Sequence, residues 1–90
     1  MQELHAILSG RVQMVMMRDF VQRKARGLKL TGWVTNLPDR TVQVVAQGDR
    51  ARVEKLLKKL HRGPLLARVD KVVAEWRESK EKFTTFDIWY

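Results

Sequence analysis

Hydrophobic and polar residues alternate along three segments of the chain, a pattern typical of β-strands that bury one face. The segments are residues 4–12, 68–77 and 83–90. The hydrophobic positions that share a face are Leu4, Ala6 and Leu8 in the first, Val72, Ala74 and Trp76 in the second, and Phe86, Ile88 and Tyr90 in the third.

Two further strands are predicted at residues 31–36 and 41–47. Between them lies Leu37-Pro38-Asp39-Arg40. Proline is common in tight turns because its φ angle is fixed, so the pair of strands is predicted to form a hairpin.

Two segments show the spacing of amphipathic helices. Residues 18–29 carry a hydrophobic stripe, and a second helix is predicted after Asp49, a good N-cap residue, up to Gly63-Pro64. The stripes consist of Phe20, Val21, Ala25 and Leu28 in the first helix and of Val53, Leu56, Leu57 and Leu60 in the second.

The order β-α-β-β-α-β, followed by a short extra strand, predicts a ferredoxin-like α/β sandwich. In this fold an antiparallel sheet carries both helices on one face. The length of 90 residues suits a single domain over residues 1–90.

The formal net charge of +8 favours anionic partners without specifying one. Cations lie on the polar sides of both predicted helices: Arg23, Lys24, Arg26 and Lys29 on the first, and Arg50, Arg52, Lys55, Lys58, Lys59 and Arg62 on the second. The predicted strand 41–47 lacks the aromatic residues on which RNA-recognition modules stack bases, so no specific nucleic acid is expected.

No segment approaches the roughly 18 consecutive apolar residues of a membrane span, and no signal-peptide pattern is found at the N-terminus. We therefore expect a cytoplasmic, monomeric protein with no membrane partner. His5 and His61 have no partners at metal-binding spacing, so no metal site is predicted.

The segment Gly10-Arg11-Val12-Gln13-Met14-Val15-Met16-Met17-Arg18 joins the first predicted strand to the first helix. The first N–H groups of a helix have no helical partner, and together with the helix dipole they attract anions. Arg18 is a cation in that first turn, where its charge is unfavourable by roughly 0.3–1 kcal/mol unless an anion offsets it. These features predict a phosphate-binding loop.

Several motifs resemble those of the acylphosphatase family over essentially the whole chain. The segment from Gly10 to Arg18 is similar to that family's phosphate loop, and Gly32-Trp33-Val34-Thr35-Asn36-Leu37-Pro38-Asp39 is similar to its second motif. Further matches are Val44-Val45-Ala46-Gln47-Gly48, the segment Arg62-Gly63-Pro64-Leu65-Leu66-Ala67-Arg68-Val69-Asp70, and Phe83-Thr84 with Phe86-Asp87-Ile88.

The resemblance implies hydrolysis of acyl phosphates to carboxylate and phosphate, with no metal or organic cofactor. The arginine matching Arg18 would bind phosphate together with the loop amides of Gln13, Met14, Val15, Met16, Met17 and Arg18 itself. The asparagine matching Asn36 would orient the attacking water. The expected partners are thus a small acyl phosphate or inorganic phosphate.

The chain departs from the family pattern at Met14, where the family has glycine, and at Met17, where it usually has an aromatic residue. A side chain at Met14 would strain the loop by about 1–3 kcal/mol if φ stays positive, or reshape it. Two hypotheses follow. Either the chain is an acylphosphatase with an impaired pocket, or it is a scaffold that has lost catalysis and binds a protein partner through Met14, Met16 and Met17. Arg40 is a milder departure, because the family commonly has glycine there.

Overall fold

The computed structural model describes residues 2–90 and contains five strands and two helices in the order β-α-β-β-α-β-β. Their bounds are β1 (Gln2–Arg11), α1 (Met17–Gly27), β2 (Thr31–Asn36), β3 (Val42–Gln47), α2 (Arg50–Arg62), β4 (Arg68–Glu78) and β5 (Phe86–Trp89). All of the predicted elements are present in the predicted order, and the differences lie at their ends.

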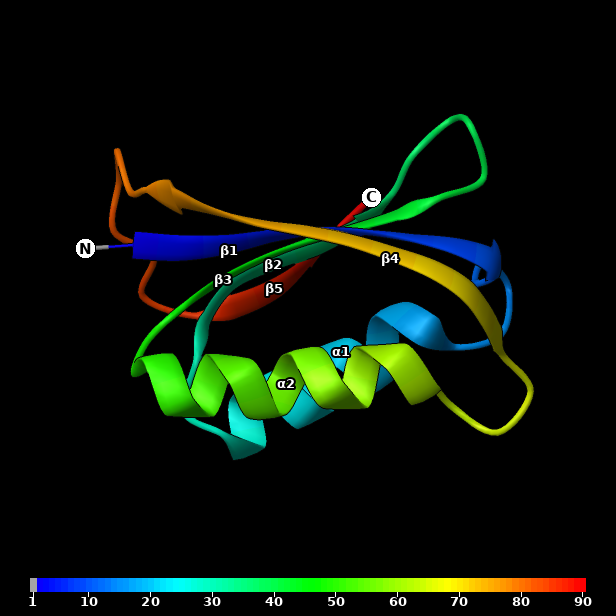
Figure 1. The fold of residues 1–90 in the computed structure, drawn as a ribbon, viewed down its shortest axis with the longest axis horizontal. Coiled ribbons are helices and arrows are strands. Elements are labelled where there is room, and N and C mark those ends of the chain that lie inside the picture. The colour runs from blue at the N-terminus through cyan, green and yellow to red at the C-terminus, as the bar shows by residue number, and fades with distance from the viewer. Residues whose placement is uncertain (1) are drawn as a thin grey trace.

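The strands form one sheet in the order β4-β1-β3-β2-β5, and both helices lie on the same side of it (Figure 1). The ferredoxin-like sandwich predicted from the sequence is therefore confirmed. The first four strands in this order pair antiparallel, whereas β5 pairs parallel with β2, with Val34 opposite Ile88. The sequence predicts an antiparallel sheet, so the parallel pairing of the edge strand β5 corrects that prediction. Because the chain reverses after β4, and β2 also runs opposite to β4, β5 must run in the direction of β2.

The hydrophobic core lies between the sheet and the two helices. Leu4, Ala6 and Leu8 of β1 face it, as predicted, and α2 contributes Val53, Leu56 and Leu60. Burying these side chains on one face of each element supplies most of the stabilisation of the helices. The opposite face of the sheet carries no helix (Figure 1).

Helix α1 begins one residue earlier and ends two residues earlier than predicted. It ends at Gly27 because Lys29 adopts a left-handed conformation with φ 58°. The N–H of Leu30 then donates to the carbonyl of Ala25 at 2.9 Å, and the N–H of Lys29 donates to that of Arg26 at 3.0 Å. These bonds satisfy the last carbonyls of the helix and terminate it.

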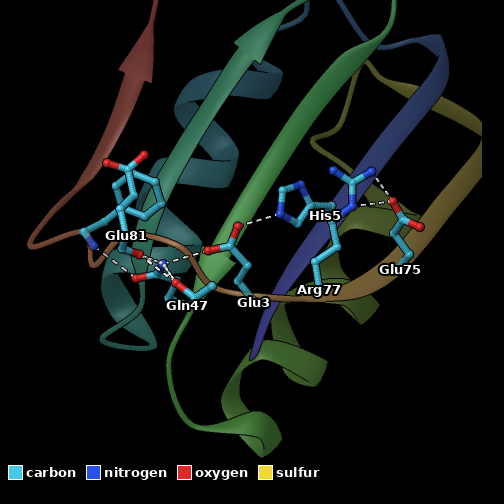
Figure 2. A network of polar contacts seen from close by, with 8 residues as sticks. Glu3, His5, Gln47, Glu75, Arg77 and Glu81 are labelled. Atoms are coloured by element: carbon cyan, nitrogen blue, oxygen red, sulfur yellow. Dashed lines mark hydrogen bonds and ion pairs between the residues drawn. The ribbon is translucent and has the colours of Figure 1, made fainter. Parts of the chain in front are cut away.

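The last strand is shorter than the predicted segment 83–90. The N–H of Phe83 donates to the side-chain oxygen of Gln47 at 3.1 Å instead of entering the sheet. Gln47 is 2% exposed, and its amide nitrogen donates to Glu3 Oε1 and to the carbonyl of Glu81, each at 2.7 Å. Figure 2 shows this network from β1 and β3 to the segment that precedes β5. Gln47 thereby holds in place the chain that leads to β5.

Candidate active site

A small pocket opens where the N-terminus of α1 meets the ends of β2 and β5. Its volume is about 70 Å³, several times the roughly 10–15 Å³ that one water molecule requires. The residues that line it are Val12, Met14, Met16, Met17, Arg18, Asp19, Asn36, Ile88 and Tyr90. The tertiary structure thus brings Arg18 and Asn36, the two predicted catalytic residues, into one pocket.

The phosphate loop predicted from the sequence leads from β1 into α1. Within residues 2–90, the N–H groups of residues 13–16 donate to no carbonyl oxygen. The N-cap residue, Met16, has φ 61° and ψ 26° and forms no side-chain capping hydrogen bond. The helix therefore presents unpaired donors at its positive end, an arrangement suited to an anion.

Arg18 lies in the first turn of α1 and is partly buried. Its guanidinium carbon is 4.9 Å from the centre of the Tyr90 ring, within the range of a cation–π contact. Arg18 forms no ion pair within the described part of the chain. The guanidinium of Arg18 therefore lies against an aromatic ring. Because no carboxylate within residues 2–90 pairs with it, it can bind an anion in the pocket.

Asn36 is the last residue of β2, directly before the turn to β3. Its side-chain oxygen is buried and accepts no hydrogen bond from residues 2–90. A buried acceptor without a partner costs about 1–3 kcal/mol, so its persistence calls for an explanation. A hydrogen-bond donor held in the pocket would satisfy it.

Gln13 attaches the loop to the β2–β3 turn. Its side-chain nitrogen donates to the carbonyls of Leu37 and Thr41, each at 2.9 Å. The sequence resemblance implied only a main-chain role for Gln13, and its side chain does not line the pocket. Gln13 therefore links the loop that leads to Arg18 with the turn that follows Asn36.

The turn itself is held by Asp39, whose carboxylate accepts hydrogen bonds from the hydroxyl of Thr41 at 2.5 Å and from its N–H at 3.1 Å. These two bonds lower the pKa of Asp39 below its usual value. Arg40 keeps the positive φ, 73°, that glycine would adopt at that position. The turn is thus retained without the glycine.

The methionines of the loop divide into two kinds. Met14 and Met16 are 99% and 67% exposed, whereas Met17 is 2% exposed and belongs to the core. The hypothesis of a protein-docking surface made of Met14, Met16 and Met17 is therefore wrong for Met17, since the first turn of α1 directs that side chain toward the sheet. Val15 packs partly buried against the core and does not line the pocket.

Met14 retains a positive φ of 60°. The loop has therefore kept the left-handed conformation that glycine favours, and the Met14 side chain extends into solvent. Its thioether does not fill the pocket.

Sequence reasoning missed Tyr90, Ile88, Val12 and Asp19 as residues of the pocket. The alternation in the last strand placed Ile88 and Tyr90 on one face, but it gave no indication that this face meets the N-terminus of α1. That proximity follows from the pairing of β5 with β2 at the sheet edge.

Among residues 2–90, no group of three or more histidine, cysteine, aspartate or glutamate residues is placed to hold a metal ion. In the same range, neither helix has the length and apolar character needed to cross a bilayer.

The chain resembles known proteins over nearly its full length. A family model described as acylphosphatase matches residues 4–88. An acylphosphatase of Thermococcus kodakarensis is 50% identical over 74 residues, which cover 82% of this chain and 81% of the relative. An acylphosphatase of Marinobacter nauticus is 44% identical over 82 residues, covering 91% of this chain and 89% of the relative.

The fold is also found among solved structures. The crystal structure of an acylphosphatase from Bacillus subtilis superimposes with a TM-score of 0.96 at 32% sequence identity, and the match covers 100% of both chains. These comparisons give no support to the alternative function of a protein-binding scaffold.

Proposed function

Because this chain belongs to the acylphosphatase family, we propose that its pocket hydrolyses acyl phosphates with Arg18 and the loop amides holding the phosphoryl group and Asn36 orienting the water. The family activity is hydrolysis of a carboxyl-phosphate anhydride to carboxylate and inorganic phosphate. The observation that supports these roles is that Arg18, Asn36 and two residues of the phosphate loop, Met14 and Met16, line the same small pocket.

The phosphoryl group would lie against the start of α1. The N–H groups of residues 13–16 are unpaired within residues 2–90 and directly precede α1, whose dipole favours negative charge at this end, and the guanidinium of Arg18 can offer two parallel donors to phosphate oxygens. The guanidinium carbon also lies 4.9 Å from the centre of the Tyr90 ring, in a cation–π contact at the edge of the pocket. Donors fixed in advance stabilise the charge that develops on the phosphoryl oxygens.

Asn36 would place the nucleophile. A side-chain amide accepts a hydrogen bond through its oxygen and donates through its nitrogen, so it can hold a water in one orientation. Its buried oxygen accepts no hydrogen bond from residues 2–90, and Asn36 is one of the residues that line this pocket. An acyl phosphate already carries a good leaving group, so positioning the water and stabilising phosphoryl charge supply most of the catalysis.

We infer that Met14 is compatible with this chemistry. The loop keeps φ at 60° there, the left-handed conformation that glycine favours, and the side chain extends into solvent. We therefore infer an active enzyme. The cytoplasmic location and the monomeric state expected from the sequence remain predictions.

The test is hydrolysis of benzoyl phosphate, together with inhibition by inorganic phosphate. Arg18→Gln should weaken phosphate inhibition and lower kcat/KM by about 100-fold or more, because it removes a charge-assisted donor. Asn36→Ala should lower kcat by about 100-fold while inhibition by phosphate stays close to that of the parent protein, because water placement is lost and phosphate binding is kept.

Arg23→Gln is the matched control, because Arg23 is an exposed arginine of α1 outside the pocket. It should retain the parent activity. Equal losses in Arg18→Gln and Arg23→Gln, or an Asn36→Ala variant with unchanged kcat, would contradict the assigned roles.

A further inference from the structure

The solvent side of the two helices carries a hollow that the proposed hydrolysis does not use. It is lined by Phe20, Lys24, Lys58, Lys59 and Arg62, with a volume of about 380 Å³. A second hollow of about 480 Å³ shares Phe20, Lys24 and Arg62 and continues along Arg23 to the loop after α2, at Leu65. We call this continuous surface the basic groove, with the cations Arg23, Lys24, Lys58, Lys59 and Arg62.

The cations of the basic groove are not neutralised by the protein. Within residues 2–90, none of the five forms an ion pair, whereas at the start of α2 Arg50 pairs with Glu54 and Arg52 lies beside Asp49. The ammonium nitrogen of Lys24 lies 5.6 Å from the centre of the Phe20 ring. These positive charges repel one another and together create a positive electrostatic potential on this face. Such a potential attracts a partner that carries many negative charges.

Two leucines project beside these cations. Leu65 is 97% exposed and Leu66 is 72% exposed, on the loop that follows Gly63. The loop is closed by a hydrogen bond from the N–H of Ala67 to the carbonyl of Pro64 at 3.0 Å. Figure 1 shows this loop at the end of α2, projecting from the helical side of the molecule. Exposed apolar side chains that adjoin one another beside polar residues are typical of a protein or membrane interaction site.

We propose that the basic groove and Leu65-Leu66 form a docking surface for an anionic lipid bilayer. The cations would contact headgroup phosphates, and the two leucines would enter the boundary between headgroups and acyl chains. This combination of a polar cationic face and inserted apolar side chains is the physical basis of peripheral membrane binding. The charge complementarity is supplied by five unpaired cations on one face.

The leucines distinguish a bilayer from a nucleic acid. A nucleic acid would use the cations, but single-stranded binding also needs aromatic platforms. The groove has one aromatic residue, Phe20, which is partly buried beneath Lys24. Exposed leucines that project from the surface offer no contact to a phosphate backbone, whereas lipid acyl chains would cover them.

The sequence prediction of no membrane partner was based on the absence of a spanning segment, and surface docking needs no such segment. None of the five cations lines the pocket that contains Arg18 and Asn36. Hydrolysis measured in solution therefore reports on the proposed function independently of lipid binding.

The experiment is co-sedimentation of the protein with vesicles of phosphatidylcholine alone and with vesicles of phosphatidylcholine and phosphatidylglycerol in equal amounts. Binding is expected to the anionic vesicles only, and to weaken as salt is added, because screening shortens the reach of the charges. Lys24→Gln/Lys58→Gln/Lys59→Gln should weaken partitioning about 100-fold, since each cation near an anionic surface contributes about fivefold.

The matched control is Lys71→Gln/Lys80→Gln/Lys82→Gln, which removes the same charge from exposed lysines of β4 and the segment after it. This variant should lose less than about fivefold. Equal losses in the two triple variants would overturn the proposal, because overall net charge would then explain the binding.

Leu65→Ser/Leu66→Ser should weaken partitioning by at least about tenfold, because apolar burial in the bilayer is lost. Val73→Ser, at an exposed valine of β4, is the control and should bind as the parent protein does. Unchanged binding of the leucine variant, or displacement of the protein from vesicles by poly(U) with no dependence on the leucines, would overturn docking on lipid. Circular dichroism of each variant confirms that the fold is retained.

Discussion

The side-chain amide of Gln13 donates a hydrogen bond to the carbonyl of Leu37 at 2.9 Å. Leu37 directly follows Asn36, and Gln13 lies in the loop that leads to Arg18. One side chain therefore fixes the distance between the element that would hold phosphate and the element that would hold water.

Gln13→Ala is expected to lower kcat/KM by about 10- to 100-fold, because small misplacement of two reacting groups has effects of this size. The loss of hydrogen bonds to two carbonyls should also lower the free energy of unfolding by about 1–3 kcal/mol. Kinetics with benzoyl phosphate and urea unfolding measure the two effects.

Gln13→Glu is an informative companion variant. A carboxylate of nearly the same shape cannot donate to the carbonyls of Leu37 and Thr41, so the variant should be impaired as much as Gln13→Ala. Full activity of Gln13→Glu would show that side-chain volume, and not hydrogen bonding, is the contribution of Gln13.

Met14→Gly tests the cost of a side chain in the phosphate loop. A non-glycine residue in the left-handed region costs about 1–2 kcal/mol, and glycine has an entropic cost of about 0.5–1 kcal/mol in the unfolded chain. The net expectation is a gain of about 0.5–1 kcal/mol in the free energy of unfolding. The change in kcat/KM should be less than about tenfold, because the Met14 side chain already extends into solvent.

Met14→Ala keeps the penalty of φ 60° and is the control for stability. It should be no more stable than the parent protein. A rise of several orders of magnitude in kcat/KM for Met14→Gly would show that the loop of the parent protein is closed to phosphate.

Lys29, after the end of α1, has the same left-handed conformation, which is unfavourable for a residue with a Cβ atom. Lys29→Gly removes this cost and should stabilise the protein by about 0.5–1 kcal/mol. Lys29→Ala should differ from the parent by less than about 0.5 kcal/mol, since it keeps a Cβ atom at φ 58°. Thermal unfolding followed by circular dichroism compares the two variants. Equal stability of the glycine and alanine variants would contradict this explanation of where the helix ends.

Glu3→Gln tests the network on the open face of the sheet (Figure 2). Burial raises the pKa of Glu3, but hydrogen bonds from Gln47, His5 and Ser79 outweigh burial and leave the pKa below its ordinary value of 4.5. Since the pKa is lower in the folded state, Glu3 contributes stability above pH 4.5, and this contribution is lost as the pH falls through the folded-state pKa.

At neutral pH, Glu3→Gln should therefore be less stable than the parent by about 1–2 kcal/mol, because bonds to a charged acceptor are replaced by weaker ones. Urea unfolding over a range of pH should show this difference shrinking in acid. A difference that is the same at neutral and acidic pH would contradict the role of the Glu3 charge.

Much of the fold was predictable from local pattern. Alternation placed Leu4, Ala6 and Leu8 on the buried face of β1, and the spacing of Val53, Leu56 and Leu60 located α2, because the chain must bury one face of each element. The phosphate loop and the candidate roles of Arg18 and Asn36 came from motifs that resemble a known family. The structure brings these two residues into one pocket, and their roles remain to be measured.

The amino-acid sequence by itself determined the order of the elements, the hydrophobic faces and the loop before α1, since these depend on neighbours within a few residues. Only the tertiary structure decided that β5 pairs parallel with β2 and that Tyr90 lies against Arg18. The physical reason is that each of these outcomes depends on contacts between segments far apart in the chain. Their energies are set by how the sheet edge and the helices pack, which periodicity does not encode.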